Sequence, residues 1–93
     1  MVIVLRGEAL KYYILASLNI EDLFGFQILQ MVASYLIINE SEFYDALTEL
    51  EYEGKITKEF VKENDFIKYN LFHITPMGKD YMEFLLEELN SRR

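Results

Sequence analysis

The stretch NESEFYDALTELEYEG, residues 39–54, decides the fold of this chain. Its apolar residues recur at the spacing of one helix face: Phe43, Ala46, Leu47 and Leu50. A helix over about 40–53 must therefore bury that face against other elements. Asn39 is suited to cap the start of this helix, and Gly54 supplies the left-handed residue that ends it.

Two apolar segments precede this helix, and each predicts a helix of its own. The first covers about 8–18 and is apolar on nearly every side, which indicates a central position. The second covers about 23–34 and holds Gly25 in its first turn, which indicates close packing of the two helices. We also expect a short edge strand or ordered arm over Val2–Leu5, and a brief strand over Tyr35–Ile38 that pairs with a later hairpin.

A hairpin and a last helix follow. Residues 55–74 hold two strand-like runs joined by a turn over 63–65, with apolar groups on both faces of the second run. Thr75 is suited to cap a helix over about 76–90, whose first residue is a proline, where the missing N–H is harmless. We therefore expect one domain over 1–93, mainly α with a small β-hairpin (α+β): a three-helix core, the hairpin and a C-terminal helix.

Composition and charge restrict the classes of function. The chain has 93 residues, 16 of them acidic and 9 basic, for a net charge of −7. This balance repels nucleic acid in general, although local basic patches escape the average. Cysteine is absent, which excludes disulfides, thiolate catalysis and cysteine-ligated metals. The hydrophobic content of 52% is above the usual range and favours a dimer interface or an apolar ligand groove.

The first residues are not typical of a targeting segment. The apolar run at 1–5 is too short for a signal peptide and is followed by Arg6 and Glu8. No run approaches the roughly 20 apolar residues that a membrane helix needs. We therefore expect a cytoplasmic protein that does not enter a membrane.

Three short motifs carry a resemblance to a known family: Phe43-Tyr44-x-Ala46-Leu47-x-x-Leu50-Glu51-x-Glu53-Gly54-x-Ile56, Phe24-Gly25-Phe26-x-Ile28, and Ile74-Thr75-x-x-Gly78. Over about residues 8–90 the chain resembles PadR-like winged helix-turn-helix transcription regulators, in which the hairpin is the wing. The resemblance implies a homodimer that binds double-stranded DNA. The third helix would enter the major groove, the wing would lie beside the backbone, and the last helix would dimerise.

Candidate DNA-binding residues lie on the third helix and the wing. If the apolar face of the helix is buried, four polar residues face outward, where they can contact base edges or phosphates: Ser41, Tyr44, Asp45 and Thr48. Four lysines of the wing are suited to contact phosphates: Lys55, Lys58, Lys62 and Lys68. The alternative is that these lysines only solubilise an apolar ribbon and protect its edge.

The third helix is unusually acidic for a DNA-reading element. It carries six carboxylates and no Lys or Arg: Glu40, Glu42, Asp45, Glu49, Glu51 and Glu53. This charge argues against nonspecific DNA binding. A second hypothesis therefore stays open, in which the chain is an acidic winged-helix protein–protein interaction module that docks a basic protein partner and does not bind DNA.

The last helix holds the candidate dimer interface. Its apolar residues form a broad stripe, and part of this stripe stays uncovered after the helix has packed on its own core: Tyr81, Met82, Leu85, Leu86 and Leu89.

The sequence gives no support to catalysis or to metal and cofactor binding. His73 is the only histidine, no spacing pairs it with carboxylates for a metal, and the four glycines form no phosphate cradle. We expect no enzyme activity, no cofactor and no metal.

Overall fold

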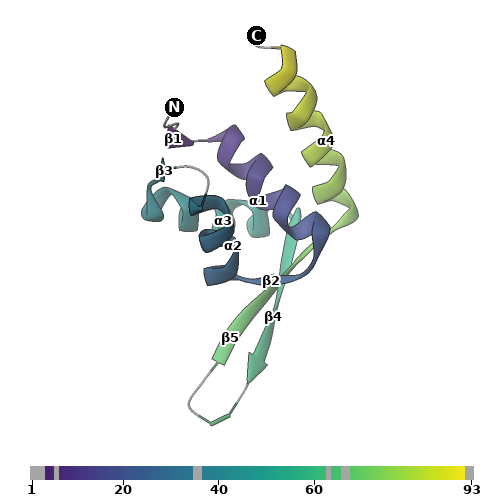
Figure 1. Ribbon diagram of the computed structural model, residues 1–93. Coiled ribbons are helices and arrows are strands. Elements are labelled where there is room, and N and C mark those ends of the chain that lie inside the picture. Colours follow the sequence, from purple (N-terminus) through teal and green to yellow (C-terminus); the bar gives the residue numbers. More distant parts are fainter. Residues whose placement is uncertain (1–3, 6, 35–36, 63, 66–67, 92–93) are drawn as a thin grey trace.

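The computed structural model describes residues 4–5, 7–34, 37–62, 64–65 and 68–91. The elements in these ranges are β1 (Val4–Leu5), α1 (Glu8–Ile20), β2 (Leu23–Phe24), α2 (Gly25–Ala33), β3 (Ile37–Ile38), α3 (Glu40–Tyr52), β4 (Ile56–Lys62), β5 (Lys68–Ile74) and α4 (Pro76–Ser91). Figure 1 shows α1, α2 and α3 gathered in a helical body, the β4–β5 wing projecting from it, and α4 extending in the opposite direction. The predicted fold class is confirmed.

Helix α1 lies at the centre of the helical body. It packs against α2, α3 and α4, and its side chains Leu10, Ile14 and Leu15 are fully buried. The other elements complete one apolar core around it: Leu18, Leu23, Ile28, Val32, Phe43, Ala46, Leu47, Leu50, Ile56, Phe72 and Leu85. The nearly all-apolar surface of this helix therefore did predict its central position. Among the residues described, no helix is both long and apolar enough to cross a membrane.

The local signals at both ends of α3 act as predicted. The Asn39 side-chain oxygen accepts a hydrogen bond from the Glu42 backbone N–H at 3.1 Å, which caps the first turn. Gly54 has a φ of 77°, the left-handed conformation that ends the helix at low steric cost. The Lys55 N–H then returns to the Leu50 carbonyl at 2.9 Å. These two ends fix the length of α3 and the point at which β4 begins.

The strand pairing differs from the prediction in one respect. Residues Ile37–Ile38 do not pair with the wing but lie parallel to β1, with Val4 opposite Ile37. The third strand of the wing sheet is β2, in which Leu23 pairs with Phe72 in the order β2-β5-β4. Residues 35–36 of the expected strand lie outside the described residues.

The start of α2 explains why residues 23 and 24 form strand β2 and not the first turn of the predicted helix. The Phe24 N–H donates to the Gln27 side-chain oxygen at 2.9 Å, so the helix begins at Gly25 rather than at residue 23. A Cβ at Gly25 would lie 3.4 Å from the Phe72 ring. This distance is ordinary van der Waals contact, and no atom of α1 lies within 4 Å of that Cβ, so the predicted close packing between the first two helices is not the reason for the glycine. Helix α1 also runs to Ile20, two residues beyond its predicted end.

The joint between the wing and α4 is tightly bonded. The Thr75 hydroxyl lies 2.8 Å from the Gly54 carbonyl oxygen and 3.0 Å from that of Lys55, and it accepts the Gly78 N–H at 3.0 Å. A Cβ at Gly78 would overlap the carbonyl oxygen of Lys55. The predicted cap by Thr75 is thus confirmed, and it also fastens the base of the wing to the end of α3.

Candidate nucleic-acid interface

A groove of about 260 Å³ separates α3 from the wing. We call it the α3–wing groove, and its lining residues are Gly25, Tyr44, Leu47, Thr48, Glu51, Lys58, Asn70 and Phe72. Tyr44, Thr48 and Lys58 were all predicted from the sequence as DNA-binding residues. The structure brings these three together in one concave surface. Asn70, whose amide can both donate and accept hydrogen bonds, is a polar residue that the sequence did not single out.

The register of the hairpin places three lysines on one face of the wing. Residues opposite each other in an antiparallel pair share a face. Lys58 pairs with buried Phe72, and Lys62 pairs with Lys68, so all three lysines lie on the same face of the hairpin as Phe72. Of the three, Lys58 lines the α3–wing groove, and Lys62 lies 3.4 Å from Asp65. Phe60, whose side chain is 63% exposed, lies on the same face between Lys58 and Lys62. The distal wing therefore presents a cationic surface with one apolar group at its centre.

Lys55 is the exception among the predicted wing lysines. It precedes β4, and its ammonium nitrogen lies 3.3 Å from a Glu53 carboxylate oxygen and 3.6 Å from the centroid of the Tyr81 ring. Only 15% of its side chain is exposed. Its charge is thus held between a carboxylate and an aromatic face, and Lys55 does not line the α3–wing groove, so its predicted phosphate contact stays a prediction without support from this geometry.

The outward face of α3 carries the predicted polar residues. Ser41, Tyr44, Asp45 and Thr48 are all exposed. The Thr48 hydroxyl donates to the Tyr44 carbonyl at 3.0 Å, which leaves its oxygen lone pairs free to accept. Tyr52, 92% exposed, continues this face by one more turn. Its position four residues after Thr48 was the sequence signal that could have identified it.

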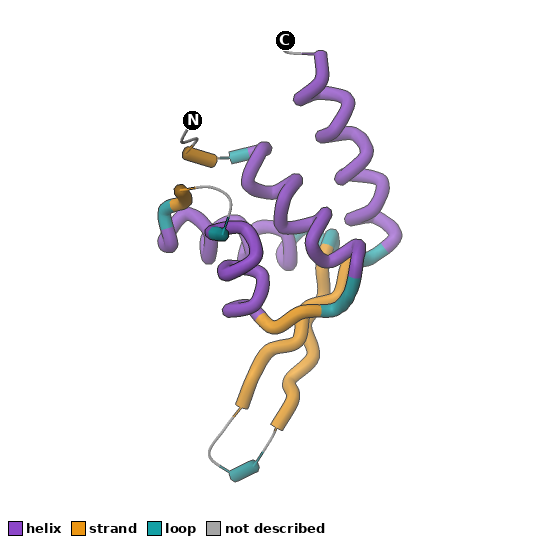
Figure 2. The backbone as a smooth tube through the Cα atoms, viewed as in Figure 1, coloured by secondary structure: helices purple, strands orange, loops and turns teal. Residues whose placement is uncertain are grey.

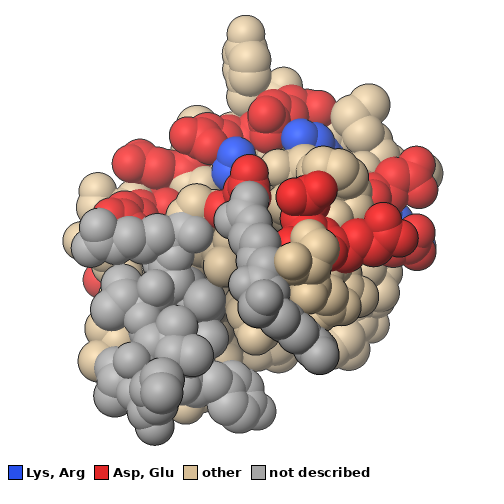
Figure 3. Space-filling model, turned by 90° about the horizontal axis from the view of Figure 1, so that it is seen from above, with Lys and Arg blue, Asp and Glu red and all other residues tan. Residues whose placement is uncertain are grey.

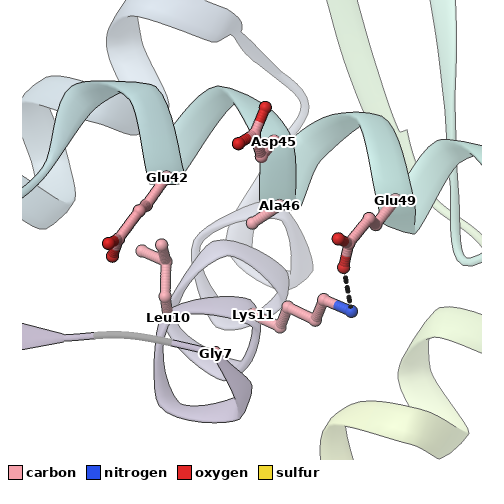
Figure 4. Close-up of a pocket in the computed structure, with 7 residues that line it drawn as sticks. All are labelled: Gly7, Leu10, Lys11, Glu42, Asp45, Ala46 and Glu49. Carbon is pink, nitrogen blue, oxygen red and sulfur yellow. Dashed lines mark ion pairs between the residues drawn. The ribbon is translucent and has the colours of Figure 1, made fainter.

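The opposite flank of α3 faces α1 across a pocket of about 320 Å³. Figure 4 shows Lys11 of α1 reaching toward Glu49, with Glu42 further along α3 and Asp45 pointing away from Lys11. The Lys11 nitrogen lies 2.7 Å from Glu49 and 3.8 Å from Glu53. Burial opposes the charge of Lys11, but the hydrogen bond to Glu49 and the charges of Glu53 and Glu49 leave its pKa raised. The same hydrogen bond and charge lower the pKa of Glu49.

These ion pairs reduce the effective charge of the acidic helix. Glu49 and Glu53 pair with Lys11, Glu53 also pairs with Lys55, and a Glu51 oxygen lies 3.4 Å from the Lys58 nitrogen. Figure 3 shows that, in the view from above, acidic side chains cover more of the described surface than lysine side chains do. Of the three glutamates named here, only Glu51 lines the α3–wing groove.

Comparison with models of protein families shows to which family this chain belongs. Residues 14–84, most of the chain, match the model of the transcriptional regulator PadR-like family. This chain belongs to the PadR-like family. The family consists of transcription regulators and not of enzymes. A search of curated proteins gave no match.

Solved structures agree with this membership. A Streptococcus mutans protein is 25% identical with a TM-score of 0.85, over 99% of this PadR-like chain and 86% of that one. A transcriptional regulator from Clostridium thermocellum is 26% identical with a TM-score of 0.79, over 91% and 86% of the two chains. Bacillus subtilis PadR, solved in complex with operator DNA, is 26% identical with a TM-score of 0.71, over 83% and 47%.

Helix α4 of this PadR-like protein presents the predicted dimer residues unequally. Leu85 is fully buried in the core, so its assignment to a dimer interface is wrong. Leu86 is exposed, while Tyr81, Met82 and Leu89 are half-buried. Phe84, which is exposed and stacks on Tyr81 with ring centroids 6.1 Å apart, adds to the apolar surface of this helix.

His73 lies on the other face of the wing from the lysines. Its two ring nitrogens lie 2.9 Å from Asp22 and 3.3 Å from Glu59. Within the described ranges, no three metal-ligating side chains gather in a geometry that suits an ion. The histidine therefore links the wing to the loop after α1 and takes no part in the α3–wing groove.

Proposed function

We propose that this PadR-like protein regulates transcription as a homodimer that binds a specific double-stranded DNA operator through α3 and the wing. The observation that carries the proposal is the hairpin register, which puts Lys58, Lys62 and Lys68 on one face of the wing, with Lys58 in the groove that Tyr44 and Thr48 line. The solution of a relative, Bacillus subtilis PadR, with operator DNA supports the same assignment.

The two surfaces have different tasks in this proposal. The three wing lysines contact phosphates, which supplies affinity and orientation but no sequence information. Ser41, Asp45 and Thr48 face outward from α3 and are of the types that hydrogen-bond to base edges in the major groove. Tyr44 lies between the two surfaces, where its hydroxyl suits a phosphate and its ring suits a thymine methyl group.

Dimerisation through α4 completes the proposal. Tyr81, Met82, Leu86 and Leu89 keep part of their apolar surface uncovered along one helix. Burying such a surface against a second copy produces a two-fold axis, and a two-fold protein reads a palindromic site. A regulator must also reach DNA, so we place the protein in the cytoplasm.

The alternative partner, a basic protein that docks on acidic α3, has less support. It rests on the six carboxylates of the helix. Three of them already have lysine partners within the chain, namely Glu49, Glu51 and Glu53. These pairs reduce the attraction that the helix can offer to a cationic partner, and they equally reduce its repulsion of DNA.

Selection of bound duplexes from a random DNA library tests the function, at about 50 mM salt so that weak phosphate binding is detected. We expect enrichment of a palindrome with half-sites about one helical turn apart. A folded protein that enriches no sequence would refute the DNA-binding role and direct the search to the basic protein partner.

Reversing the charge of wing lysines tests the surface itself. We expect Lys58→Glu and Lys62→Glu each to lower operator affinity about tenfold, and the double variant about a hundredfold, because each removes a phosphate contact and adds a repulsive charge. Lys79→Glu, an exposed reversal on α4, is the matched control and should change affinity much less. Titration of labelled operator DNA measures the affinity of each variant. Equal losses in Lys58→Glu and Lys79→Glu would remove the wing from the mechanism.

A further inference from the structure

Phe60 is an exposed aromatic residue in the distal half of the wing. Its side chain is 63% exposed, and Figure 1 shows that the strand carrying it projects away from the helical body. The residue opposite it on β5 is Asn70, which is polar and also exposed. The ring is no part of the buried core, so its apolar surface is available to a partner.

The surroundings of Phe60 indicate the chemistry of that partner. Lys58 and Lys62 lie two positions before and after it on the same face of β4, each roughly 7 Å away along the strand. The ammonium of Lys68, on the neighbouring strand, lies 5.8 Å from the centroid of the ring. A partner that covers Phe60 must therefore offer negative charge on both sides of an apolar contact.

A second exposed aromatic residue near the wing has a different setting. Phe26 of α2 is 46% exposed, stacks on Phe24 with ring centroids 5.9 Å apart, and lies 5.7 Å from the ring of Tyr69. Tyr69 pairs with Val61, so this aromatic cluster belongs to the hairpin face that the lysines do not occupy. The rings there cover one another. Phe60 lies among cations, which favours a polyanion that also carries apolar groups.

We infer that Phe60 contacts the deoxyribose surface of bound DNA, between phosphates that the flanking lysines contact. This inference rests on the proposed function. Along a DNA strand, anionic phosphates alternate with deoxyriboses, whose carbon atoms are apolar, so the backbone repeats the alternation of charge and apolar surface on this face of the wing. The contact removes apolar surface from water and adds affinity that does not depend on salt. It carries no sequence information, because every nucleotide has the same sugar.

The test compares Phe60→Ala with Phe60→Leu. Labelled operator and random duplex are titrated with wild-type protein and each variant over a series of salt concentrations. We expect Phe60→Ala to lower both affinities by the same factor, about three- to tenfold, because it removes apolar contact area. Phe60→Leu keeps an apolar side chain and should stay within about twofold of wild type. Both variants should keep the salt dependence of wild type, because neither removes a charge.

Two reference variants complete the design. Ile20→Ala removes an apolar side chain that is 78% exposed at the end of α1, and it should change either affinity less than about twofold. Lys62→Glu removes a phosphate contact, so its loss of affinity should shrink as the salt concentration rises. The loss in Phe60→Ala should stay constant over the same series. Melting curves establish that each variant folds.

The outcomes separate this inference from the function on which it rests. If wild-type protein binds its operator and Phe60→Ala binds both duplexes as tightly, the ring contacts no DNA and the inference alone is overturned. A larger loss on the operator than on random duplex would mean a contact with base edges or a base step, which also overturns it. An equal loss in Phe60→Leu, or a salt dependence as shallow as that of Lys62→Glu, would show that apolar contact area is not the cause. If wild-type protein binds neither duplex, the proposed function fails and this inference fails with it.

Discussion

The base and the distal half of the wing are built from one hairpin but differ in what surrounds them. At the base, Ile56 and Phe72 are buried in the core, and β2 adds a third strand beside β5. In the distal half, Lys62 and Lys68 are exposed, and Phe60 stands out from the same face. Figure 2 shows this change, where the strands leave the helical body as a narrow two-stranded ribbon.

The difference separates stability from binding along a single element. Apolar burial at the base stabilises the fold and fixes the direction of the ribbon. The distal lysines make exposed contacts, Lys62 with Asp65 at 3.4 Å and Lys68 with the Phe60 ring at 5.8 Å. Neither contact belongs to the buried core, so these residue types can change without loss of the core. Under the proposed function, a regulator built this way can alter its DNA contacts in the distal wing while the base fixes the direction of the ribbon.

The largest effect should come from the base. Phe72→Ala removes a buried ring that packs beside Gly25 and pairs with β2, and we expect it to destabilise the protein by about 3–5 kcal/mol. Chemical denaturation followed by circular dichroism measures the change. A loss below about 1 kcal/mol would mean that the base does not support the core, and the contrast between the two halves would disappear.

A second effect at the base concerns the joint with α4. In most helices Gly→Ala is favourable, but a methyl group at Gly78 would overlap the Lys55 carbonyl oxygen and lie 2.9 Å from an Ile74 side-chain carbon. We therefore expect Gly78→Ala to destabilise the protein by about 1–3 kcal/mol. Glu83→Ala, at an exposed position of the same helix, is the control and should stay within about 0.5 kcal/mol of wild type. A stabilised Gly78→Ala variant would show that the joint is looser than its contacts indicate.

Local signals made much of the helical part predictable. Asn39 and Thr75 are side-chain caps whose effect depends on residues three positions away, and Gly54 acts through its own backbone. The spacing of the apolar residues in α3 likewise predicts which face of the helix is buried. Such features depend on neighbours in the sequence, so the sequence alone was enough to locate them.

Other features depend on distant contacts and were missed. Leu85 and Leu86 are adjacent on a helix that is apolar on several sides, and only the packing of α4 on α1 decides which one is buried. Lys55 is held by the ring of Tyr81, 26 positions away in the sequence, so its type alone suggested a phosphate contact. The two-residue strands β2 and β3 are too short to carry a pattern that identifies their partners.

The smallest effect should come from the distal half, and it tests the contrast from the other side. Lys68 is exposed, and its ammonium lies 5.8 Å from the Phe60 ring centroid, a weak contact at an exposed site. We expect Lys68→Ala to leave stability within about 0.5 kcal/mol of wild type. Operator affinity should fall about three- to tenfold, and the salt slope should become shallower by about 0.9.

The salt dependence of DNA affinity is the decisive measurement for Lys68. A lost phosphate contact lowers both the affinity and its salt dependence. A general loss of positive charge lowers the affinity wherever the lysine lies. Lys79→Ala on α4 removes the same charge away from the wing and should leave the slope close to that of wild type. If Lys68→Ala lowers stability more than affinity, the distal wing is part of the folded core. Binding and stability would then be joined along the hairpin, and the base could no longer be regarded as a support for an independent binding surface.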